Sequence, residues 1–597
     1  MSAPATADPN ASAPREDINN AVIRLAGNSQ DGIQTIGGFL ARLAGRSAQE
    51  VMTYMTIPST ISGGASIFQV RIGSGEVLSP GDSADFLVAF YQDSFENHIG
   101  ALRDGGVCIY DTDHVELPEE KDSRFKYVGV PITSTTIEAI GGSARDRGKN
   151  IFVLGLLCRV FDLDREKLTH IIESQFKSKH ESVLRNAMLA FDAGYAFDLG
   201  DVFAQSFEFH PGEADSENRV TTDGNTALSY GLLAAGVRYG AGYPITPWSP
   251  IMETLRSELP KYGGIFVQSE DELAAVSTAV GFAFAGHLAI TGSSGPGLSL
   301  KMEALGYASM AELPLIVINV QRGGPSTGLP TSVEQSDLMQ AIYGSHGDTP
   351  RVVLAPKDVE DCYYIALEAA RIAREFSTPV IILSDQALSS RIEAFEEPDF
   401  SQVAEPALDQ QPRGEDFRPY PLDAETKHAP PGTKMLAGKY PVVTGLEHDE
   451  WGHPSSNPEL HQKMTDRRRN KLKRLAESLP QPEVFGAAEG EVLLVGWGST
   501  WGPIREAVEV SRAAGHGVSA IHLRHLHPMP EGIDEIMEGC SHVLVVEMND
   551  QGMYGYGQLA TLLRARFAKS NIQSLTKTDG LTFKIREIIA GIEAASA

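Results

Sequence analysis

The sequence GYPITP at residues 242–247 closes the first of four apolar, strand-like segments that lie within residues 225–337. The other three segments also end in polar residues or glycines, at residues 268–270 (QSE), 292–297 (GSSGPG) and 321–328 (QRGGPSTG). Helical patterns alternate with these segments, which predicts a doubly wound parallel sheet with helices on both faces. Such sheets bind ligands beyond the carboxyl ends of their strands. The four polar ends therefore predict one shared binding site.

Length and composition predict a multidomain globular protein. A chain of 597 residues is longer than one hydrophobic core supports, so three or four domains are expected. No apolar run approaches the roughly 18 residues that span a bilayer, so no membrane partner is expected. Residues 1–17 are rich in Ala, Pro, Ser and Asp and lack the apolar centre of a signal peptide. This predicts a disordered tail and a cytoplasmic protein.

The net charge argues against a nucleic-acid partner. A formal charge of −28 offers little of the basic face that such binding requires. The basic run at residues 467–474 is an exception, and its spacing is typical of a solvated or partner-facing helix.

Cysteine and histidine usage predicts no metal site in this chain. The four cysteines are far apart, which is typical of buried free thiols. They are Cys108, Cys158, Cys362 and Cys540. An iron–sulfur cluster needs about four thiolates, usually at short spacing, so any cluster is expected in another chain. His522, His525 and His527 have no carboxylate or thiolate at ligand spacing beside them.

Changes in composition and periodicity divide the chain into segments. Three of them are predicted to be α/β domains, at residues 18–210, 223–392 and 489–597. A polar, acidic linker is expected at residues 211–222. Residues 393–488 are rich in Pro, Asp, Glu, Gln and His, and they predict a connecting arm that wraps across a neighbouring domain or subunit. One helical segment is expected in this arm, near residues 459–479.

Two interpretations are open for the turn between Gly27 and Gly32, which follows a strand-like segment and precedes an amphipathic helix pattern. The glycines either allow a tight turn with close packing of the helix or let the helix start bind a phosphate.

The four strand ends belong to longer motifs. These are YPITP at residues 243–247, QSEDE at 268–272, SGPGLSL at 294–300 and VQRGGPSTGLPT at 320–331. In this order and spacing they resemble the pyrimidine-binding domain of the 2-oxoacid:ferredoxin oxidoreductases. Nearly the whole chain is similar to the α subunit of 2-oxoglutarate:ferredoxin oxidoreductase, in the form with a γ domain fused at its amino end. The resemblance implies that the first domain is this γ domain, associated with coenzyme A, and that the last is a transketolase C-terminal-like domain.

The resemblance implies thiamine diphosphate as a cofactor, which needs a carboxylate beside N1′ of its aminopyrimidine ring. Hydrogen bonding at N1′ favours the imino tautomer, whose nitrogen takes the proton from C2 of the thiazolium. Glu270 ends an apolar segment, and the family's catalytic glutamate falls at this position. The alternative for Glu270 is the capping role expected of Asp271 and Glu272, because acids in a first helical turn complement the helix dipole.

By the same resemblance, Thr246, Arg322 and Thr331 line the pocket for the 2-oxoacid. The planar guanidinium of Arg322 matches a carboxylate through two parallel hydrogen bonds. The residues implied in cofactor binding are Tyr243, Pro244, Ile245, Glu270, Ser294 and Gly295.

One expected motif is missing from the sequence. The chain has no Gly-Asp-Gly with a downstream Asn-Asn, the arrangement that holds the metal and the diphosphate in the other binding domain of this cofactor. A β subunit is therefore expected to supply the diphosphate and Mg²⁺ site. By resemblance, it also supplies a [4Fe–4S] cluster that passes electrons to ferredoxin, in an assembly expected to be (αβ)2.

The sequence thus predicts an oxidoreductase subunit. 2-Oxoglutarate, coenzyme A and oxidised ferredoxin would give succinyl-CoA, carbon dioxide and reduced ferredoxin, in a reaction that can run in either direction. Pyruvate or another 2-oxoacid is the alternative substrate, because residues that grip a distal carboxylate can come from the partner. The alternative of another class is a non-catalytic scaffold subunit, although Thr246, Glu270 and Arg322 are all present.

Overall fold

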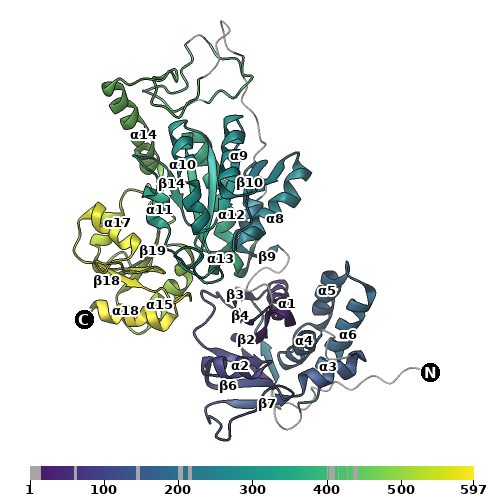
Figure 1. Ribbon diagram of the computed structural model, residues 1–597. Coiled ribbons are helices and arrows are strands. Elements are labelled where there is room, and N and C mark those ends of the chain that lie inside the picture. Colours follow the sequence, from purple (N-terminus) through teal and green to yellow (C-terminus); the bar gives the residue numbers. More distant parts are fainter. Residues whose placement is uncertain are drawn as a thin grey trace. The chain divides into compact units, whose positions relative to one another are not determined.

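The computed structural model describes residues 15–58, 63–142, 148–199, 206–212, 218–399, 401, 411–414, 416–426, 428–434 and 442–596 (Figure 1). The α/β class predicted from the sequence is confirmed. The chain divides into two compact units, one formed by residues 1–222 with 391–397 and the other by residues 223–390 with 398–597. Of the predicted tail, residues 1–14 lie outside the described residues, whereas β1 (Arg15–Ile18) pairs in parallel with β8 (Ser206–Phe209).

In the described part of the first unit, eight strands form a mixed sheet in the order β7-β6-β5-β2-β4-β3-β16-β9. These strands are β2 (Asn20–Asn28), β3 (Glu50–Thr56), β4 (Ala65–Gly73), β5 (Ala84–Ala89), β6 (Leu102–Asp111), β7 (Lys126–Val130), β9 (Arg219–Asp223) and β16 (Ile392–Glu396). The helices described here are α1 (Ile33–Arg46), α2 (Gln92–His98), α3 (Ile132–Ile140), α4 (Lys149–Val160), α5 (Arg165–Phe176) and α6 (Glu181–Ala196). Ile33, Ile36, Leu40 and Leu43 form a buried stripe along α1, and this stripe packs into the core of the unit.

Two short strands of this sheet lie where the sequence predicted none. Strand β9 includes the end of the predicted linker at 211–222, and β16 includes the start of the predicted arm at 393–488. Arg219 on β9 donates hydrogen bonds to the carboxylate of Glu50 on β3 (2.7 Å) and to the carbonyl of Ala394 on β16 (2.8 Å). Each of these strands has only five residues, and β9 is mostly polar, so neither carries the longer apolar alternation that predicts a strand.

In the described residues of the second unit, seven strands form one sheet in the order β11-β10-β12-β13-β15-β14-β20, and five form another in the order β17-β19-β18-β21-β22. The seven are β10 (Tyr239–Gly242), β11 (Ile265–Gln268), β12 (Ala289–Ser293), β13 (Leu315–Gln321), β14 (Val352–Leu354), β15 (Pro379–Asp385) and β20 (His525–His527). The five are β17 (Val484–Phe485), β18 (Gly490–Gly496), β19 (Val518–His522), β21 (Cys540–Glu547) and β22 (Ile572–Thr576).

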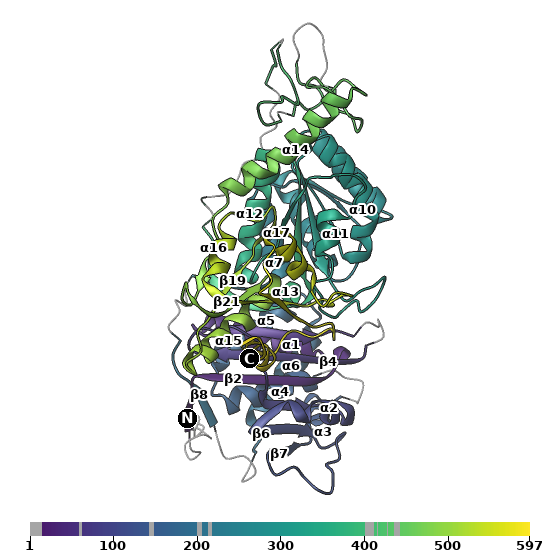
Figure 2. The ribbon, with the colours of Figure 1, turned by 90° about the vertical axis from the view of Figure 1, so that its left-hand side faces the viewer.

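Helices of the second unit connect these strands. Those described are α7 (Gly224–Ala234), α8 (Ser249–Glu258), α9 (Glu272–Phe284), α10 (Gly295–Met310), α11 (Leu338–Tyr343), α12 (Val359–Phe376), α13 (Gln386–Ser390), α14 (Pro458–Ser478), α15 (Trp501–Ala513), α16 (Ile533–Glu538), α17 (Gln558–Phe567) and α18 (Ile585–Ser596). Figure 2 shows α12 on one side of the seven-stranded sheet and α10 on the other. Strands β12, β13 and β15 are buried along their whole length, as expected when both faces are covered. The strands from β11 to β14 are parallel, so the predicted doubly wound sheet is confirmed.

The two sheets of the second unit share one hydrophobic core. Leu315 and Val317 of β13 belong to the same buried cluster as Trp497, Leu523 and Val543 from the carboxyl-terminal part. Strand β20, which lies between β19 and β21 in the sequence, leaves their sheet and pairs antiparallel with β14. The common core and this strand pairing connect two segments that were predicted from the sequence to be separate domains. The predicted domain boundaries stay predictions.

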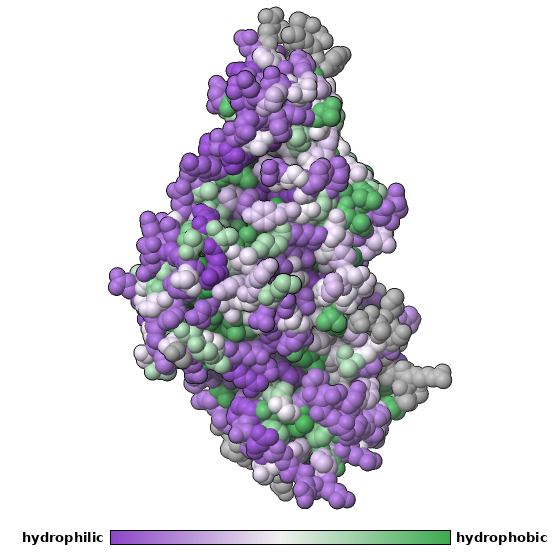
Figure 3. All heavy atoms as spheres, turned by 60° about the vertical axis from the view of Figure 1, so that its left-hand side comes forward, coloured by the Kyte–Doolittle hydropathy of each residue, from purple (hydrophilic) through white to green (hydrophobic). Residues whose placement is uncertain are grey.

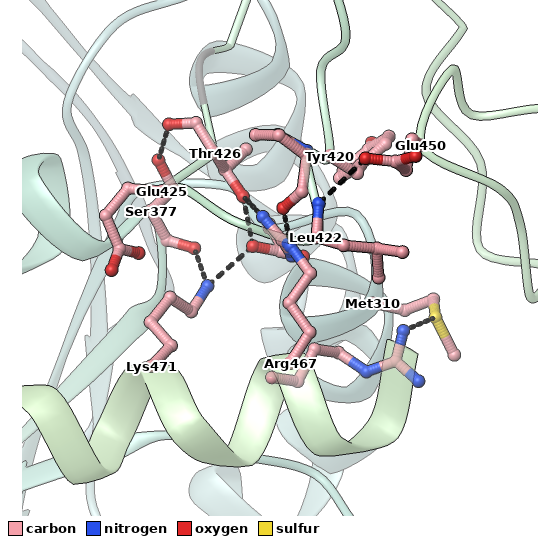
Figure 4. A network of polar contacts seen from close by, with 12 residues as sticks. Met310, Ser377, Tyr420, Leu422, Glu425, Thr426, Glu450, Arg467 and Lys471 are labelled. Atoms are coloured by element: carbon pink, nitrogen blue, oxygen red, sulfur yellow. Dashed lines mark hydrogen bonds and ion pairs between the residues drawn. The ribbon is translucent and has the colours of Figure 1, made fainter. Parts of the chain in front are cut away.

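The basic run at residues 467–474 lies on α14, the helix predicted in the arm, but part of the run is buried rather than solvated. Lys471 Nζ lies 2.7 Å from a carboxylate oxygen of the fully buried Glu312, and Arg467 pairs with the same carboxylate. Figure 4 shows Arg467 and Lys471 extending from α14 toward Thr426 and Ser377. Although burial favours the neutral acid, Lys471 and Arg467 lower the pKa of Glu312 to about 2. The i,i+4 spacing of the two cations fits one face of a helix whether that face is buried or solvated, so the charge pattern alone did not show the buried contact.

The surface is mixed in polarity. On the face shown in Figure 3, hydrophilic and hydrophobic residues are interspersed, and the hydrophobic ones gather in small groups. Among the described residues, no helix has both the length and the apolar character that crossing a bilayer requires.

Candidate active site

The carboxyl ends of β11, β10, β12 and β13 lie side by side along the carboxyl-terminal end of the seven-stranded sheet. Gly242 at the end of β10 is in register with Gln268 of β11 and with Gly292 of β12, and Ser293 of β12 is in register with Asn319 of β13. Neighbouring strands are about 4.8 Å apart, which separates the ends of β11 and β13 by about 15 Å. The four polar segments found in the sequence therefore lie together at the carboxyl-terminal end of the sheet.

Glu270 lies two residues beyond β11 and is exposed. The next residue, Asp271, is the N-cap of α9, and its carboxylate accepts a hydrogen bond from the amide of Ala274 at 2.7 Å. Within the part of the chain that the structure describes, no group forms a hydrogen bond or an ion pair with the carboxylate of Glu270. The capping role therefore belongs to Asp271, and the carboxylate of Glu270 remains available to a ligand.

The turn after β10 carries four of the predicted residues. Tyr243, Pro244 and Thr246 are exposed, and Ile245 is half-buried. The carbonyl of Thr246 accepts a hydrogen bond from the guanidinium of Arg322 at 2.6 Å. This bond ties the turn to the end of β13, two strands away.

The end of β12 forms a tightly packed cradle. A Cβ at Gly292 would lie 2.2 Å from the indole of the buried Trp248, so this position requires glycine. Ser293 and Ser294 are buried, and among the described residues their hydroxyl groups have no hydrogen-bond partner. Because buried polar groups are nearly always hydrogen-bonded, these hydroxyls are candidates for contact with a ligand. Gly295 follows as the first residue of α10.

Arg322 directly follows β13, and its side chain is largely buried. Its guanidinium donates to the carbonyls of Thr246 and Thr327, at 2.6 and 3.2 Å. An arginine carries five N–H donors, so most of its donor capacity remains for a ligand. Among the described residues, its Nε has no partner. Burial lowers the pKa of Arg322, and the nearby Asp337 opposes this effect.

A cavity of about 850 Å³ opens beside Arg322 and Gly295. The loop after β13 and the start of α10 form one wall, and residues of the segment after β21 form another, including Asp550, Gly552 and Tyr556. Ligand-binding clefts typically measure about 300–1,000 Å³, so a substrate or part of a cofactor fits here.

Two carboxyl groups that the sequence prediction missed, Glu334 and Asp337, line this cavity. The side-chain amide of Asn319 donates to Asp337 at 2.8 Å. Burial raises the pKa of both carboxyl groups above their ordinary values. A signal was available, because the polar run VEQSD at residues 333–337 closely follows the last of the four motifs. The run NDQGMYGYG at residues 549–557 likewise follows the end of β21 as a further polar strand end.

Of the predicted site residues, Arg322 and Gly295 line the cavity, whereas Thr331 and the predicted residues at the ends of β10 and β11 do not. Thr331 is half-buried in the loop that returns from β13, next to a bridge between Gly323 and Leu329. The described residues that line the cavity include Arg322 but not Thr331 or Thr246. Thr246 and Arg322 are joined by a hydrogen bond, and the substrate-binding roles of all three residues stay predictions.

In the first unit, the turn between Gly27 and Gly32 is closely packed. Gly32 has a φ of 74°, and the side-chain amide of Asn150 on α4 donates to its carbonyl at 3.1 Å. A Cβ at Gly27 would lie 2.6 Å from the side chain of Ile33 on α1. These contacts show that the turn is closely packed, and phosphate binding at the helix start stays an open alternative.

Metal-binding groups are not clustered in the described residues. No set of three His, Cys, Asp or Glu side chains there is arranged to hold a metal ion. His525 contacts the carboxylate of Glu368 at 2.7 Å, and His527 contacts the carbonyl of Arg351 at 2.8 Å. The four cysteines are free and buried, as predicted.

Three family models match the chain. They are "Pyruvate flavodoxin/ferredoxin oxidoreductase, thiamine diP-bdg" over residues 230–467, "Pyruvate ferredoxin/flavodoxin oxidoreductase" over residues 22–197 and "Pyruvate:ferredoxin oxidoreductase core domain II" over residues 490–588.

Relatives match along nearly the full length. The 2-oxoglutarate oxidoreductase subunit KorA of Mycobacterium tuberculosis is 37% identical, and the alignment covers 98% of this chain and 92% of that protein. Subunit alpha of the 2-oxoacid:ferredoxin oxidoreductase 1 of Aeropyrum pernix is 30% identical, with coverage of 89% and 91%. A solved structure of 2-oxoglutarate:ferredoxin oxidoreductase from Magnetococcus marinus, with 2-oxoglutarate, coenzyme A and succinyl-CoA bound, is 32% identical with a TM-score of 0.88, and the match covers 97% of this chain and 100% of that one.

The parallel sheet, the free carboxylate at the end of β11 and the match to a thiamine-binding domain define a subunit of a thiamine-dependent oxidoreductase. Within that class, the chain belongs to the 2-oxoacid:ferredoxin oxidoreductase family, because relatives of that family match it over nearly its whole length.

Proposed function

We propose that the chain is the α subunit of a 2-oxoglutarate:ferredoxin oxidoreductase. The reaction converts 2-oxoglutarate and coenzyme A to succinyl-CoA and carbon dioxide, and two electrons reduce ferredoxin one at a time. The structural match to the Magnetococcus marinus enzyme carries this proposal most strongly, because it spans 97% of the chain at a TM-score of 0.88. The reaction can run in either direction.

The residues at the strand ends fit thiamine diphosphate. Glu270 offers a carboxylate that has no partner among the described residues, and Ser294 offers a buried hydroxyl in the same situation. When bound, the cofactor supplies a carbon nucleophile that attacks the 2-oxo group. Glu270 would hold the proton at N1′ of the aminopyrimidine and so would favour the imino tautomer.

The remaining predicted cofactor residues lie at the same carboxyl-terminal end of the sheet. Tyr243, Pro244 and Ile245 would contact the pyrimidine ring from the turn after β10, and Gly295 lets the start of α10 approach the ligand. Exposure of the turn supports this role, because a ring can reach it without displacing core residues.

Arg322 would bind the carboxylate of the 2-oxoacid. Arg322 lines the cavity and has donors to spare, and a charged donor forms the stronger type of hydrogen bond with a carboxylate. Its bond to the carbonyl of Thr246 fixes the guanidinium relative to the turn, so Thr246 positions Arg322 and offers its own hydroxyl to the substrate. Thr331 is proposed as a further hydroxyl donor in the assembled enzyme.

A second subunit completes the site in this proposal. It supplies the Mg²⁺ and diphosphate site and the [4Fe–4S] cluster, and the pairs assemble as (αβ)2 in the cytoplasm with ferredoxin as acceptor. Two exposed side chains beside the cavity support a partner here, because Met553 and Tyr554, which directly follow cavity-lining Gly552, are 90% and 86% exposed. Large apolar side chains at such a position are typical of protein interfaces.

Substrate choice tests the proposed function. The reconstituted α–β complex is expected to turn over 2-oxoglutarate with a kcat/KM at least about tenfold above that for pyruvate, the scale of one additional charged hydrogen bond. The measurement is ferredoxin reduction with each 2-oxoacid at saturating coenzyme A. A preference for pyruvate would overturn the 2-oxoglutarate assignment and leave the family assignment unchanged.

A further inference from the structure

A second cavity of about 850 Å³ lies in the second unit, at the amino-terminal end of the strands of the seven-stranded sheet. The candidate active site lies at their carboxyl-terminal end. The lining residues Thr349, Pro350 and Arg351 lead directly into β14, which is parallel to β15. They therefore lie at the amino ends of strands whose carboxyl ends point toward the candidate active site. The opposite wall comes from α14, and His527 and Arg566 close one side.

The lining of this cavity is strongly basic in an acidic protein. It contains one carboxylate, from Asp348, and five arginine or lysine side chains, in a chain with a formal charge of −28. The cations are Arg351, Arg468, Arg469, Lys473 and Arg566. Three of them have acidic neighbours on the arm: Arg468 pairs with Glu447, Arg469 with Asp466 and Lys473 with Glu477. Within the described residues, the other two arginines have no carboxylate at ion-pair distance.

Arg351 is a fully buried cation beneath the cavity wall. Its guanidinium contacts the sulfur of Met302 at 3.3 Å and the hydroxyl of Ser345, and its Nε has no partner among the described residues. Burial lowers its pKa to about 10. A buried charge without a counter-ion is strongly unfavourable, so an anion in the cavity would stabilise this part of the fold.

Arg566 reaches the same cavity from the end of α17. Its guanidinium donates to the carbonyls of Met529 and Pro530, both at 3.3 Å. These long bonds to neutral groups leave most of the donors of Arg566 free. Burial lowers the pKa of Arg566, and the nearby carboxylates of Asp534 and Glu531 oppose this effect without reaching ion-pair distance. Tyr343, 65% exposed at the cavity, adds a flat apolar surface beside the cations.

We propose that this cavity binds a phosphate-bearing organic anion of nucleotide size. Arginine forks match phosphate oxygens in pairs, which favours phosphate at the site of Arg566. The phenol ring of Tyr343 provides a stacking surface for a base. The volume lies within the range of small-molecule sites and exceeds what a lone inorganic anion fills.

The probe for this site is ADP, titrated by calorimetry into the assembled α–β complex with coenzyme A saturating, so that the co-substrate site is already occupied. One ADP per α chain is expected to bind, with higher affinity than inorganic pyrophosphate, which offers the charge without the ring. Arg566→Gln and Lys473→Gln are each expected to weaken ADP binding at least about tenfold, the scale of one charged hydrogen bond.

The matched control is Arg474→Gln, which removes the neighbouring cation of α14 that pairs with Glu425 outside the cavity. It is expected to leave ADP affinity unchanged, and all three variants are expected to keep the KM for coenzyme A. The proposal would be overturned by the absence of saturable ADP binding, by equal affinity for ADP and pyrophosphate, or by an unaltered affinity in Arg566→Gln. An increased KM for coenzyme A in Arg566→Gln would also overturn it, because the cavity would then belong to the co-substrate.

Discussion

Replacing Glu270 with Gln is expected to lower kcat for 2-oxoglutarate decarboxylation at least about a hundredfold, the usual scale for loss of a proton-transfer group. Glutamine keeps the size of the side chain, but its neutral amide cannot stabilise a proton at N1′ as a carboxylate does. Because Glu270 is exposed and has no partner among the described residues, the substitution disturbs no internal bond. The measurement is carbon dioxide release by the assembled complex at saturating substrates.

Asp271→Asn is the matched control for this variant. Asp271 caps α9 through the amide of Ala274, and asparagine is an equally good N-cap, so both stability and kcat should stay near the wild-type values. A Glu270→Gln complex with undiminished kcat would instead support the scaffold interpretation.

Replacing Glu312 with Gln is expected to loosen α14 from the second unit. The fully buried carboxylate pairs with both Arg467 and Lys471, and removing one partner of a buried ion pair typically costs about 3–5 kcal/mol, because charges are left uncompensated. Hydrogen–deuterium exchange of the α14 amides measures this local loss, with faster exchange expected throughout the helix. Glu303→Gln on the exposed side of α10 is the control and should leave the exchange of α14 unchanged.

The same pair predicts a pH dependence. The folded pKa of Glu312, about 2, lies below its ordinary value of 4.5. The folded state therefore binds fewer protons, and the stabilisation is complete above about pH 4.5 and is lost as the pH falls toward 2. Exchange of α14 in the wild type should accelerate over this range, and the part due to this carboxylate should be missing in Glu312→Gln. Identical pH profiles in the two proteins would contradict the ion-pair account.

Much of the second unit could be predicted because its signals are local. Apolar segments with polar ends predicted strands β10 to β13. Parallel pairing of the backbones then brings those ends together, so this part of the site does not depend on contacts between side chains. That the carboxylate of Glu270 has no hydrogen-bond partner among the described residues was harder to predict. Any of the three acids at 270–272 could cap the helix, and only the structure shows that Asp271 accepts the capping hydrogen bond.

The remaining features depend on contacts between distant segments. The sequence gives no local sign that β20 crosses to β14, that Arg219 holds β9 in a sheet, or that Arg467 is buried against Glu312. The polar strand end near Asp550 is visible in the sequence, but its place in the cavity wall is not, because these residues follow a strand of another sheet of the unit. Long-range pairing of this kind is decided by the whole fold rather than by periodicity.

The central claim is that this chain supplies the pyrimidine side of a thiamine site completed by a second subunit. The most direct test is calorimetric titration of thiamine diphosphate with Mg²⁺ into the isolated chain and into the α–β complex. The account predicts one cofactor per α–β pair in the complex and an affinity at least about a hundredfold weaker for the isolated chain, which lacks the partner's charged contacts to the diphosphate. Equal affinity and full stoichiometry in the isolated chain would contradict it.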